Sequence, residues 1–483
     1  MRETGSNSSP VADLLLALDR AGTEPLHRQI ATSIRDGIRG GRLRRGSALP
    51  PTRTLATSLD VSRGVVVEAY QQLRAEGYIS SKTGGYTEVA VDGTGAAAEP
   101  LPAPRPAHRP RIDFKYGRSD PAQFPRTAWL RSVTRVLTHA PVARFEYLSG
   151  QGVPELREAL ADYLNRVRGT AASSRNIVIC SGFAQGIALL IQTLARDPDM
   201  AGRRLRRLAV EDPSTADDLR YVCDLCGVDL VPIPVGPGGI RAELLDRSGA
   251  DAVVVTPSHQ WPVGAVLSPD NRAVLLNWAR ANGTLIIEDD YDAEYRYDRA
   301  PVGALHGLAP DHVVYAGTAS KTLAPGLRLG WLILPGRLTE PVAAAKIAAD
   351  RGSPVIDQLA FADFLSRGEF DRHLRRMRPV YRRRRDTLLA ALARDLPELR
   401  PDGISAGFHL ITWLPPGLEE AAVVAAAAKR EVGVYGLAEY YLVPGPPGLL
   451  FGYAGLSEHV ITEGVTLLAQ AIRTPRRKSG AWG

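Results

Sequence analysis

A proline-, alanine- and glycine-rich segment, residues 91–111, divides the chain. It includes the run Glu-Pro-Leu-Pro-Ala-Pro-Arg-Pro-Ala-His-Arg-Pro at 99–110. Such a composition cannot bury a core and favours an extended, semi-rigid linker. We therefore expect two separately folding parts, residues 20–90 and 112–475, and a disordered tail at 476–483.

Composition is that of a soluble globular protein, with 45% apolar and 23% charged residues in 483. The sequence contains no apolar run of about eighteen residues, and its first residues lack the core of a signal peptide. Three cysteines are too few for a disulfide scaffold. Cys223 and Cys226 form a single Cys-x-x-Cys, which favours helix-packing thiols over a zinc site. We expect a cytoplasmic protein with no metal and no membrane contact.

The front part has the pattern of a helix-turn-helix. Its first predicted helix ends at Gly40-Gly41 and carries apolar residues every four positions, at Leu26, Ile30, Ile34 and Ile38. A second helix, with Thr52 as its predicted cap, ends near Leu59, and a third, capped by Ser62, reaches Gly77. The turn between these two is tight, so the third helix should enter the major groove of DNA.

A hairpin is predicted after the third helix, because residues 78–80 and 86–89 alternate around Gly84-Gly85. This hairpin would be a wing. Arg63, in the first turn of the third helix, is placed to contact a base edge or a phosphate. A three-helix packing module with solvated arginines is the alternative, but the cations crowded between Arg35 and Arg63 favour DNA binding.

Three motifs in this part resemble the winged-helix head of the GntR superfamily: Leu-Pro-Pro-Thr-Arg-Thr-Leu-Ala at 49–56, Val-Ser-Arg-Gly-Val-Val-Val-Glu-Ala-Tyr-Gln-Gln-Leu at 61–73, and Ala-Glu-Gly-Tyr-Ile at 75–79. The resemblance implies that Arg53, Arg63 and the wing glycine Gly85 contact double-stranded DNA. The sequence departs from the family pattern at Pro51, where serine is usual, and in the wing, where Gly-Tyr-Thr replaces Gly-Thr-Phe.

Past Phe114, strands alternate with helices, which is typical of an open α/β sheet. One strand runs through a glycine turn into a helix, whose free N–H groups near Gly182, Phe183 and Ala184 suit a phosphate. Another apolar strand, starting at Thr284, ends in Glu-Asp-Asp at 288–290, at the edge of the sheet where ligands bind.

A lysine in a Ser/Thr/Gly-rich turn lies within residues 315–334, and Arg328 follows Lys321 by seven positions. A lysine beside a second cation in a dry site has the depressed pKa that a Schiff base requires, while arginine pairs phosphate oxygens. A carboxylate at Asp289 would keep a pyridine nitrogen protonated, and Tyr291 would bond the ring hydroxyl. The set suits pyridoxal 5'-phosphate. The alternative is a surface turn with two solvated cations.

Three segments resemble the aminotransferase-like half of the MocR family: Thr-Pro-Ser-His-Gln-Trp-Pro-Val-Gly at 256–264, Glu-Asp-Asp-Tyr-Asp-Ala-Glu-Tyr-Arg-Tyr at 288–297, and Gly-Thr-Ala-Ser-Lys-Thr-Leu-Ala-Pro-Gly-Leu-Arg-Leu-Gly at 317–330. The resemblance covers about 25–471. It implies an α/β domain of fold type I, like aspartate aminotransferase, with a small domain at about 355–475. It also implies a domain-swapped, head-to-tail homodimer, in which each head lies on its partner's cofactor domain and which suits paired DNA half-sites.

The residue roles implied by this resemblance are these: Lys321 forms the Schiff base, Asp289 meets the ring nitrogen and Tyr291 the ring hydroxyl, and the phosphate is surrounded by Ser320, Arg328, Gly182, Phe183 and Ala184. The basic run 372–386 resembles the helix leading into the small domain, so a solvated helical face is favoured over nucleic-acid contact.

Ordinary transamination needs an arginine for the substrate carboxylate, and the alignment puts Leu450 there. Trp261 stands where aminotransferases carry asparagine, and Ser214-Thr215 replaces a usual aromatic. We expect a transcriptional regulator without turnover or catalytic residues, with pyridoxal phosphate as effector and vitamin B6 synthesis genes as targets. Two alternatives remain: a regulator that senses an amino compound such as γ-aminobutyrate through the cofactor, and a working aminotransferase.

Overall fold

The computed structural model describes residues 14, 16–81, 86–92, 110–117, 119–196, 204–297, 302–403 and 406–473. Two compact units divide the chain, Met1–His108 and Arg109–Gly483, and each is described by itself. Gly85, most of the predicted linker and the predicted tail lie outside the described residues. No helix among the described residues is long and apolar enough to cross a membrane.

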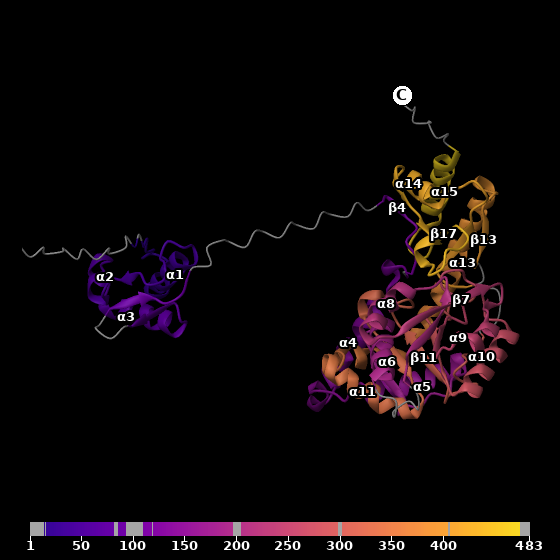
Figure 1. The fold of residues 1–483 in the computed structure, drawn as a ribbon, viewed down its shortest axis with the longest axis horizontal. Helices are drawn as coiled ribbons and strands as arrows, with labels where there is room; N and C mark the ends of the chain where they lie inside the picture. The colour runs from indigo at the N-terminus through magenta and orange to yellow at the C-terminus, as the bar shows by residue number, and fades with distance from the viewer. Residues whose placement is uncertain are drawn as a thin grey trace, which may run out of the picture. The chain divides into compact units, whose positions relative to one another are not determined.

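The front unit is a winged helix-turn-helix (Figure 1). Its helices are α1 (Leu26–Arg39), α2 (Thr52–Ser58) and α3 (Arg63–Ala75). The wing strands β2 (Ile79–Ser81) and β3 (Thr87–Val89) pair antiparallel as predicted. The four-residue apolar repeat of α1 forms the core, because Ile30, Ile34 and Ile38 are fully buried against α3 and β2.

Three details of the front unit differ from the sequence-based expectation. Thr52 is the first residue of α2 and not its cap, since Pro51 takes the N-cap position. Ser62 does stand at the N-cap of α3, but its hydroxyl makes no capping hydrogen bond. A two-residue strand, β1 (Ala48–Leu49), was not predicted; it pairs with β3 and completes a sheet of order β1-β3-β2. So short a strand leaves no period to detect.

The rear unit is built on an eight-stranded sheet of order β5-β12-β11-β10-β9-β6-β7-β8. Neighbouring strands from β11 to β7 run parallel, whereas β12 is antiparallel to both neighbours and β8 is antiparallel to β7. Because the sheet is mostly parallel, the carboxyl ends of its strands gather at one edge. The strand bounds are β5 (Ile177–Cys180), β6 (Arg207–Asp212), β7 (Asp229–Gly236), β8 (Gly239–Ile240), β9 (Ala252–Val255), β10 (Leu285–Asp290), β11 (Val313–Thr318) and β12 (Gly330–Ile333).

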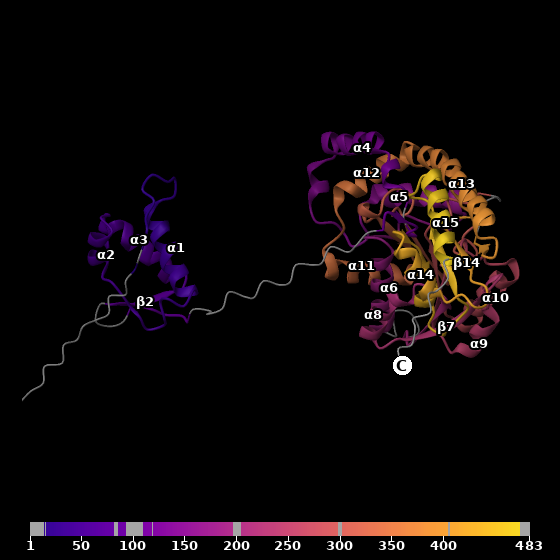
Figure 2. The ribbon, with the colours of Figure 1, turned by 90° about the horizontal axis from the view of Figure 1, so that it is seen from above.

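Helices cover both faces of this sheet (Figures 1 and 2). One face packs on α6 (Phe183–Arg196), α8 (Ala216–Cys226) and α11 (Gly336–Asp350), through strand residues such as Val178 and Leu332. The other face packs on α5 (Pro154–Arg168), α12 (Val355–Ser366) and α10 (Pro269–Asn282). It does so through the strand residues that alternate with those of the first face, such as Ile179 and Ile286. Strands buried on both sides explain why β9 and β11 read as uninterrupted apolar runs.

A second sheet, of order β13-β14-β17-β16, forms the small domain. Its strands are β13 (Arg400–Asp402), β14 (His409–Trp413), β16 (Tyr435–Gly436) and β17 (Gly448–Gly452), covered by α13 (Glu369–Asp395), α14 (Glu420–Ala428) and α15 (Glu458–Arg473). The strand β4 (Ile112–Asp113), which follows the linker, pairs in parallel with β15 (Val432–Gly433). The small domain thus includes the first residues of the unit.

Two expectations about this region need correction. The helix α12 was placed at the start of the small domain, but it packs on α4 (Arg126–His139) and α5, and Phe361 stacks on Trp331 of the central sheet. The basic run in α13 is only partly a solvated face. Arg384 is buried and pairs with Asp120 at 2.9 Å, and Arg385 is buried under the ring of Tyr297.

Candidate functional site

A pocket of about 410 Å³ opens at the carboxyl edge of the large sheet. Segments from distant parts of the chain form it: the loop after β11, the end of β10, the start of α6, the loop after β9, and the stretch that follows β4. Its lining consists of Tyr116, Gly117, Phe183, Ala184, Thr215, Trp261, Asp289, Tyr291, Thr318, Ser320, Lys321, Pro325 and Arg328.

Lys321 projects into this pocket from the loop that follows β11. Its Nζ donates a hydrogen bond of 2.6 Å to the carbonyl oxygen of Gly117. Gly117 adopts φ +67°, and a Cβ there would lie 3.2 Å from Nζ. A glycine at this position therefore lets the backbone approach the lysine. The amine lies inside a partly enclosed site and faces the same space as Asp289 and Arg328.

Asp289 lies at the end of β10 and faces the pocket. Its Oδ1 is buried and has no hydrogen-bond partner among the described residues. Burial raises the pKa of this carboxyl well above its ordinary value, the neighbouring Asp290 raises it further, and Lys321 opposes the shift. A buried carboxylate oxygen without a donor is costly, so it fits a ligand that supplies an N–H.

The end of the pocket that is predicted to hold a phosphate is built from the start of α6 and the loop 318–328. The first helical hydrogen bond of α6 runs from Gly186 to Gly182 at 3.2 Å, which leaves the N–H groups of Phe183 and Ala184 without helical partners. Ser320 adds a buried hydroxyl that has no partner among the described residues. These donors converge on one side of the pocket, as an anion requires.

Arg328 follows the short helix η4 (Pro325–Leu327) and has φ +50°. Its guanidinium reaches back to donate a hydrogen bond to the Ser181 carbonyl. Gly182, with φ +90°, lies directly beneath it, since a Cβ there would be 3.0 Å from Arg328 Nη2. The guanidinium is thus held over the start of α6, where it can pair phosphate oxygens.

Tyr291 also lines the pocket, and its hydroxyl is already engaged. It donates to the carbonyl oxygen of His259 at 2.9 Å and lies 3.2 Å from His259 Nδ1. The loop that carries His259 and Trp261 is anchored from below by the buried Glu211, which accepts hydrogen bonds from Thr256 at 3.0 and 2.6 Å. Burial raises the pKa of Glu211 to about 7 despite these bonds.

Leu450, which the sequence comparison above aligns with the substrate-binding arginine of aminotransferases, is fully buried in β17. It belongs to an apolar cluster beside the pocket, together with Trp261, Tyr291, Ile411 and Leu437. The only cations that line the pocket among the described residues are Lys321 and Arg328, and both lie near the predicted cofactor position. The side of the pocket formed by this cluster is therefore apolar and aromatic.

Eight residues were predicted to bind the cofactor. Seven of them line this pocket, and the eighth, Gly182, lies under Arg328. Sequence reasoning missed Tyr116, Gly117, Thr318 and Pro325 as lining residues. A Tyr-Gly pair shortly after a two-residue strand was the available signal for the first two. It was uninformative by itself, because only tertiary contact brings this stretch to Lys321.

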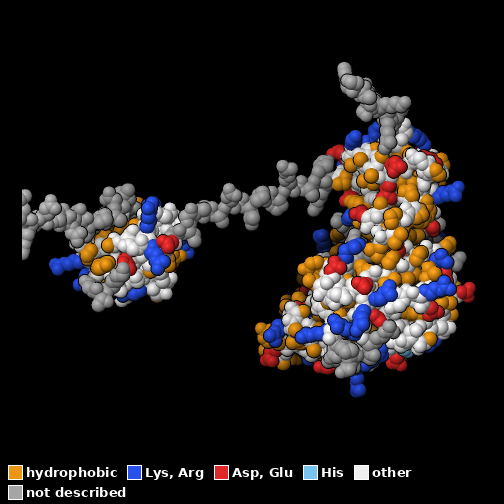
Figure 3. Space-filling view, viewed as in Figure 1, with side chains coloured by type: hydrophobic (Ala, Val, Ile, Leu, Met, Phe, Trp, Pro, Cys, Tyr) orange, Lys and Arg blue, Asp and Glu red, His pale blue; other side chains and the backbone are white. Residues whose placement is uncertain are grey.

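Two of the predicted DNA-contacting residues, both arginines, lie in the front unit. Arg53 is in α2 and Arg63 is the first residue of α3; both are exposed. Within the described part of the chain, neither side chain forms an ion pair. On the face of this unit drawn in Figure 3, Lys and Arg side chains project outward. A free guanidinium at the start of the recognition helix is suited to phosphate or base contact.

Comparison with known proteins agrees with this division of the chain. Residues 26–89 match the family model described as bacterial regulatory proteins, gntR family, and residues 114–467 match aminotransferase class I and II. The chain is 32% identical to the probable rhizopine catabolism regulatory protein MocR of Rhizobium meliloti, over 95% of this chain and 96% of that protein. It is 31% identical to the pyridoxine biosynthesis transcriptional regulator PdxR of Corynebacterium glutamicum, over 93% and 97%.

Among solved structures, the rear unit resembles LysN, the α-aminoadipate aminotransferase of Thermus thermophilus, in complex with N-(5'-phosphopyridoxyl)-L-leucine. The identity is 25% and the TM-score 0.67, over 75% of this chain and 92% of that one. The winged helix, the fold type I domain and the full-length matches lead to one assignment: the chain belongs to the MocR family of HTH-type transcriptional regulators, in which a GntR head is joined to an aminotransferase class I and II domain.

Proposed function

We propose that this regulator binds pyridoxal 5'-phosphate at Lys321 and that the cofactor is its effector, controlling vitamin B6 synthesis genes. The observation that carries the proposal is the pair of unpartnered buried polar atoms, Asp289 Oδ1 and Ser320 Oγ, which face the same pocket as the Lys321 amine. One suits a pyridinium N–H and the other a phosphate oxygen. The relative PdxR is named for pyridoxine biosynthesis, which supports the choice of target.

Each residue has a distinct task in holding this group. Asp289 accepts from the ring nitrogen, Arg328 and the start of α6 bind the phosphate, and Lys321 supplies the amine that condenses with the aldehyde. When bound, the cofactor supplies an electron-withdrawing ring. The aromatic side chains of Tyr116 and Trp261, whose ring centroids are 4.9 Å apart, supply an apolar part of the pocket wall.

Transaminase turnover is not part of the proposed function, because the described residues that line the pocket include no cation besides Lys321 and Arg328 to pair a substrate carboxylate. Leu450 is apolar and buried where the anchoring arginine is required. This same feature weakens the alternative of an amino-acid effector. A head-to-tail homodimer on paired DNA half-sites remains part of the proposal, because two-fold symmetric regulators read two-fold symmetric operators.

The test is a titration of apo protein with pyridoxal phosphate, followed by visible absorbance and by a gel shift on DNA from the protein's own upstream region. We expect a yellow Schiff-base band that is absent in Lys321→Ala, and a change in DNA affinity with no amino compound present. An unchanged DNA affinity in the presence of a full band would reject the cofactor as effector. Sustained turnover with an amino donor and a keto acid would instead favour the enzyme.

A further inference from the structure

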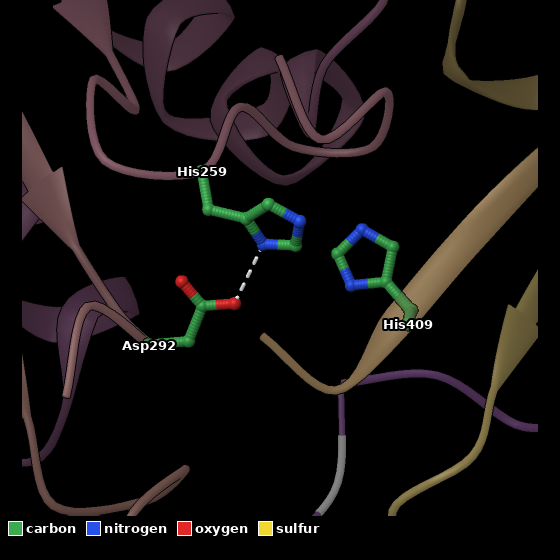
Figure 4. Close-up of side chains that lie close together, drawn as sticks. All are labelled: His259, Asp292 and His409. Atoms are coloured by element: carbon green, nitrogen blue, oxygen red, sulfur yellow. Dashed lines mark hydrogen bonds and ion pairs between the residues drawn. The ribbon is translucent and has the colours of Figure 1, made fainter. Parts of the chain in front are cut away.

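Three buried side chains behind the pocket have no role in the function proposed above (Figure 4). His259 Nδ1 lies 2.8 Å from Asp292 Oδ2, and the imidazole of His409 lies beside that of His259, with ring centroids 4.8 Å apart. All three residues are 1% exposed. Burying two imidazoles and a carboxylate is costly unless their polar atoms are satisfied, so the hydrogen bonding of the cluster is informative.

Both nitrogens of His259 face acceptors. Nδ1 faces the Asp292 carboxylate and Nε2 faces the carbonyl oxygen of Gly403 at 3.2 Å. An imidazole satisfies two acceptors only when it carries both protons. His409 is different, since its Nε2 contacts one carbonyl, that of Pro262, at 3.1 Å. With Asp292 ionised, this geometry places one positive charge on His259, paired with the Asp292 carboxylate.

The surrounding groups act on this pair in both directions. Burial raises the pKa of Asp292, which opposes its ionisation, while His259 and the Tyr291 hydroxyl act to lower it. Burial lowers the pKa of His259, but Asp292 and the Gly403 carbonyl outweigh it, so that the net pKa is raised; Arg296 opposes them. Burial and the nearby His259 hold the pKa of His409 well below its usual range. Tyr291 is the remaining titratable group in contact with the cluster, and burial raises its pKa well above the ordinary value.

The cluster joins the two halves of the rear unit. His259 follows β9 and Asp292 follows β10, both in the large domain, whereas Gly403 and His409 belong to β13–β14 of the small domain. The backbones meet closely here. A Cβ on Gly407 would lie 2.3 Å from Asp292 Oδ2 and 2.4 Å from His259 Cε1. Movement of the small domain would therefore disturb the His259–Asp292 pair.

The cluster also reaches the cofactor pocket. The hydroxyl of Tyr291 donates to the His259 carbonyl at 2.9 Å, and the Tyr291 ring lines the pocket beside Asp289. Trp261, two residues after His259, lines the same pocket and packs on His409 at 4.6 Å between ring centroids. His259 therefore contacts a residue of the pocket wall, Tyr291, and also contacts Gly403 of the small domain.

We propose that the His259–Asp292 pair is a positioning element that holds Tyr291, which lines the pocket, and couples pocket occupancy to the position of the small domain. The inference rests on the proposed function, since the signal it transmits is cofactor binding. The charge on His259 holds the Gly403 carbonyl of the small domain and the Asp292 carboxylate of the large domain together. Asp292 neutralises that charge, which is what permits it to be buried.

The test compares wild type with Asp292→Asn and His259→Gln, using His306→Asn as a matched control. His306 is a fully buried histidine of the large domain whose Nδ1 accepts from the Ala171 N–H, and it is not among the described residues that line the pocket. In apo protein, we expect faster hydrogen exchange in β14 for the two cluster variants and no change for the control. With pyridoxal phosphate, we expect the band to form, its pH midpoint to move by about one unit, and the change in DNA affinity to fall at least fivefold.

Two outcomes separate the inference from the function on which it rests. Wild-type exchange in β14 together with a wild-type pH midpoint and DNA response in Asp292→Asn would overturn the inference and leave the cofactor site intact. A wild-type protein that forms no band with pyridoxal phosphate would overturn the proposed function, while the exchange measurement on apo protein would still decide whether the pair holds the small domain. Asp292→Asn keeps the shape of the side chain, so it remains informative if His259→Gln does not fold.

Discussion

Replacing Gly182 with alanine should weaken cofactor binding through Arg328 and not through general instability. The residue has φ +90°, and the added Cβ would lie 3.0 Å from Arg328 Nη2. An L-residue in this region of backbone space costs about 1–2 kcal/mol. The guanidinium is the flexible partner in the contact, so it moves away from the start of α6 and loses its place at the phosphate.

The expected size of the effect follows from that displacement. A hydrogen bond to a charged group is worth about 1.5–3 kcal/mol. Since about 1.4 kcal/mol is a tenfold change in affinity, the Kd for pyridoxal phosphate should rise roughly tenfold to a hundredfold. Pyridoxal, which has the aldehyde but no phosphate, should bind the variant and wild type equally. Titration of the visible band with both compounds measures the two values.

Gly227→Ala is the control for backbone strain. Gly227 ends α8 in the left-handed region, at φ +64°, with no atom within 4 Å of an added Cβ. It should lose a similar free energy of unfolding and keep the wild-type Kd. The reasoning is refuted if Gly182→Ala binds pyridoxal phosphate as tightly as wild type, or if its affinity for pyridoxal falls by the same factor.

Three further predictions concern other parts of the chain. Arg63→Ala should weaken operator binding and reduce the salt dependence of log K by about one phosphate contact. Arg74→Ala, at the exposed far end of α3, should leave both quantities unchanged. Equal effects of the two variants in gel shifts at several salt concentrations would remove Arg63 from the interface. Burial raises the Glu211 pKa from 4.5 to about 7. The stabilisation from the protonated carboxyl is present below pH 4.5 and is lost as the pH rises through 7, so the free energy of unfolding should fall by about 3 kcal/mol over this range. Urea unfolding at several pH values should show this fall in wild type and not in Glu211→Gln. Leu450→Arg should lower the free energy of unfolding by about 3–5 kcal/mol, as an unpaired buried charge does, while Leu450→Met should cost under about 1.5 kcal/mol; a tolerated arginine would mean that the cluster around Leu450 is open to water.

Much of the architecture was predictable because it rests on local periodicity. The four-residue repeat of α1, the apolar runs of β9 and β10, and the glycine turn before α6 each report a local structure without knowledge of their partners. Features that depend on tertiary contact were not predictable. The assignment of α12 to the large domain depends on Phe361 meeting Trp331, and the burial of Arg384 depends on Asp120, which is distant in sequence.

The same distinction applies to the pocket. Lys321, Asp289 and Arg328 lie in motifs whose residue types state their chemistry, so the sequence alone brings them to attention. The carbonyl of Gly117 and the ring of Tyr116 carry no such chemical signature; they matter because β4 pairs with β15 and leaves this stretch next to Lys321. The His259–Asp292 pair lies inside two of the quoted motifs, but its link to Gly403 belongs to the three-dimensional structure alone.

The hydrogen bond between Lys321 and Gly117 has a consequence for communication along the chain. Gly117 is four residues after β4, the first strand to follow the linker, and β4 is fastened to the small domain through the bonds of Ile112 and Phe114 to Glu431 and Gly433. A nitrogen that becomes bonded to a cofactor carbon has fewer hydrogens to share with a carbonyl. Under the proposed function, a bond between that amine and the cofactor therefore competes with the hydrogen bond to the Gly117 carbonyl, so occupancy of the pocket changes what holds the segment that joins β4 to the large domain.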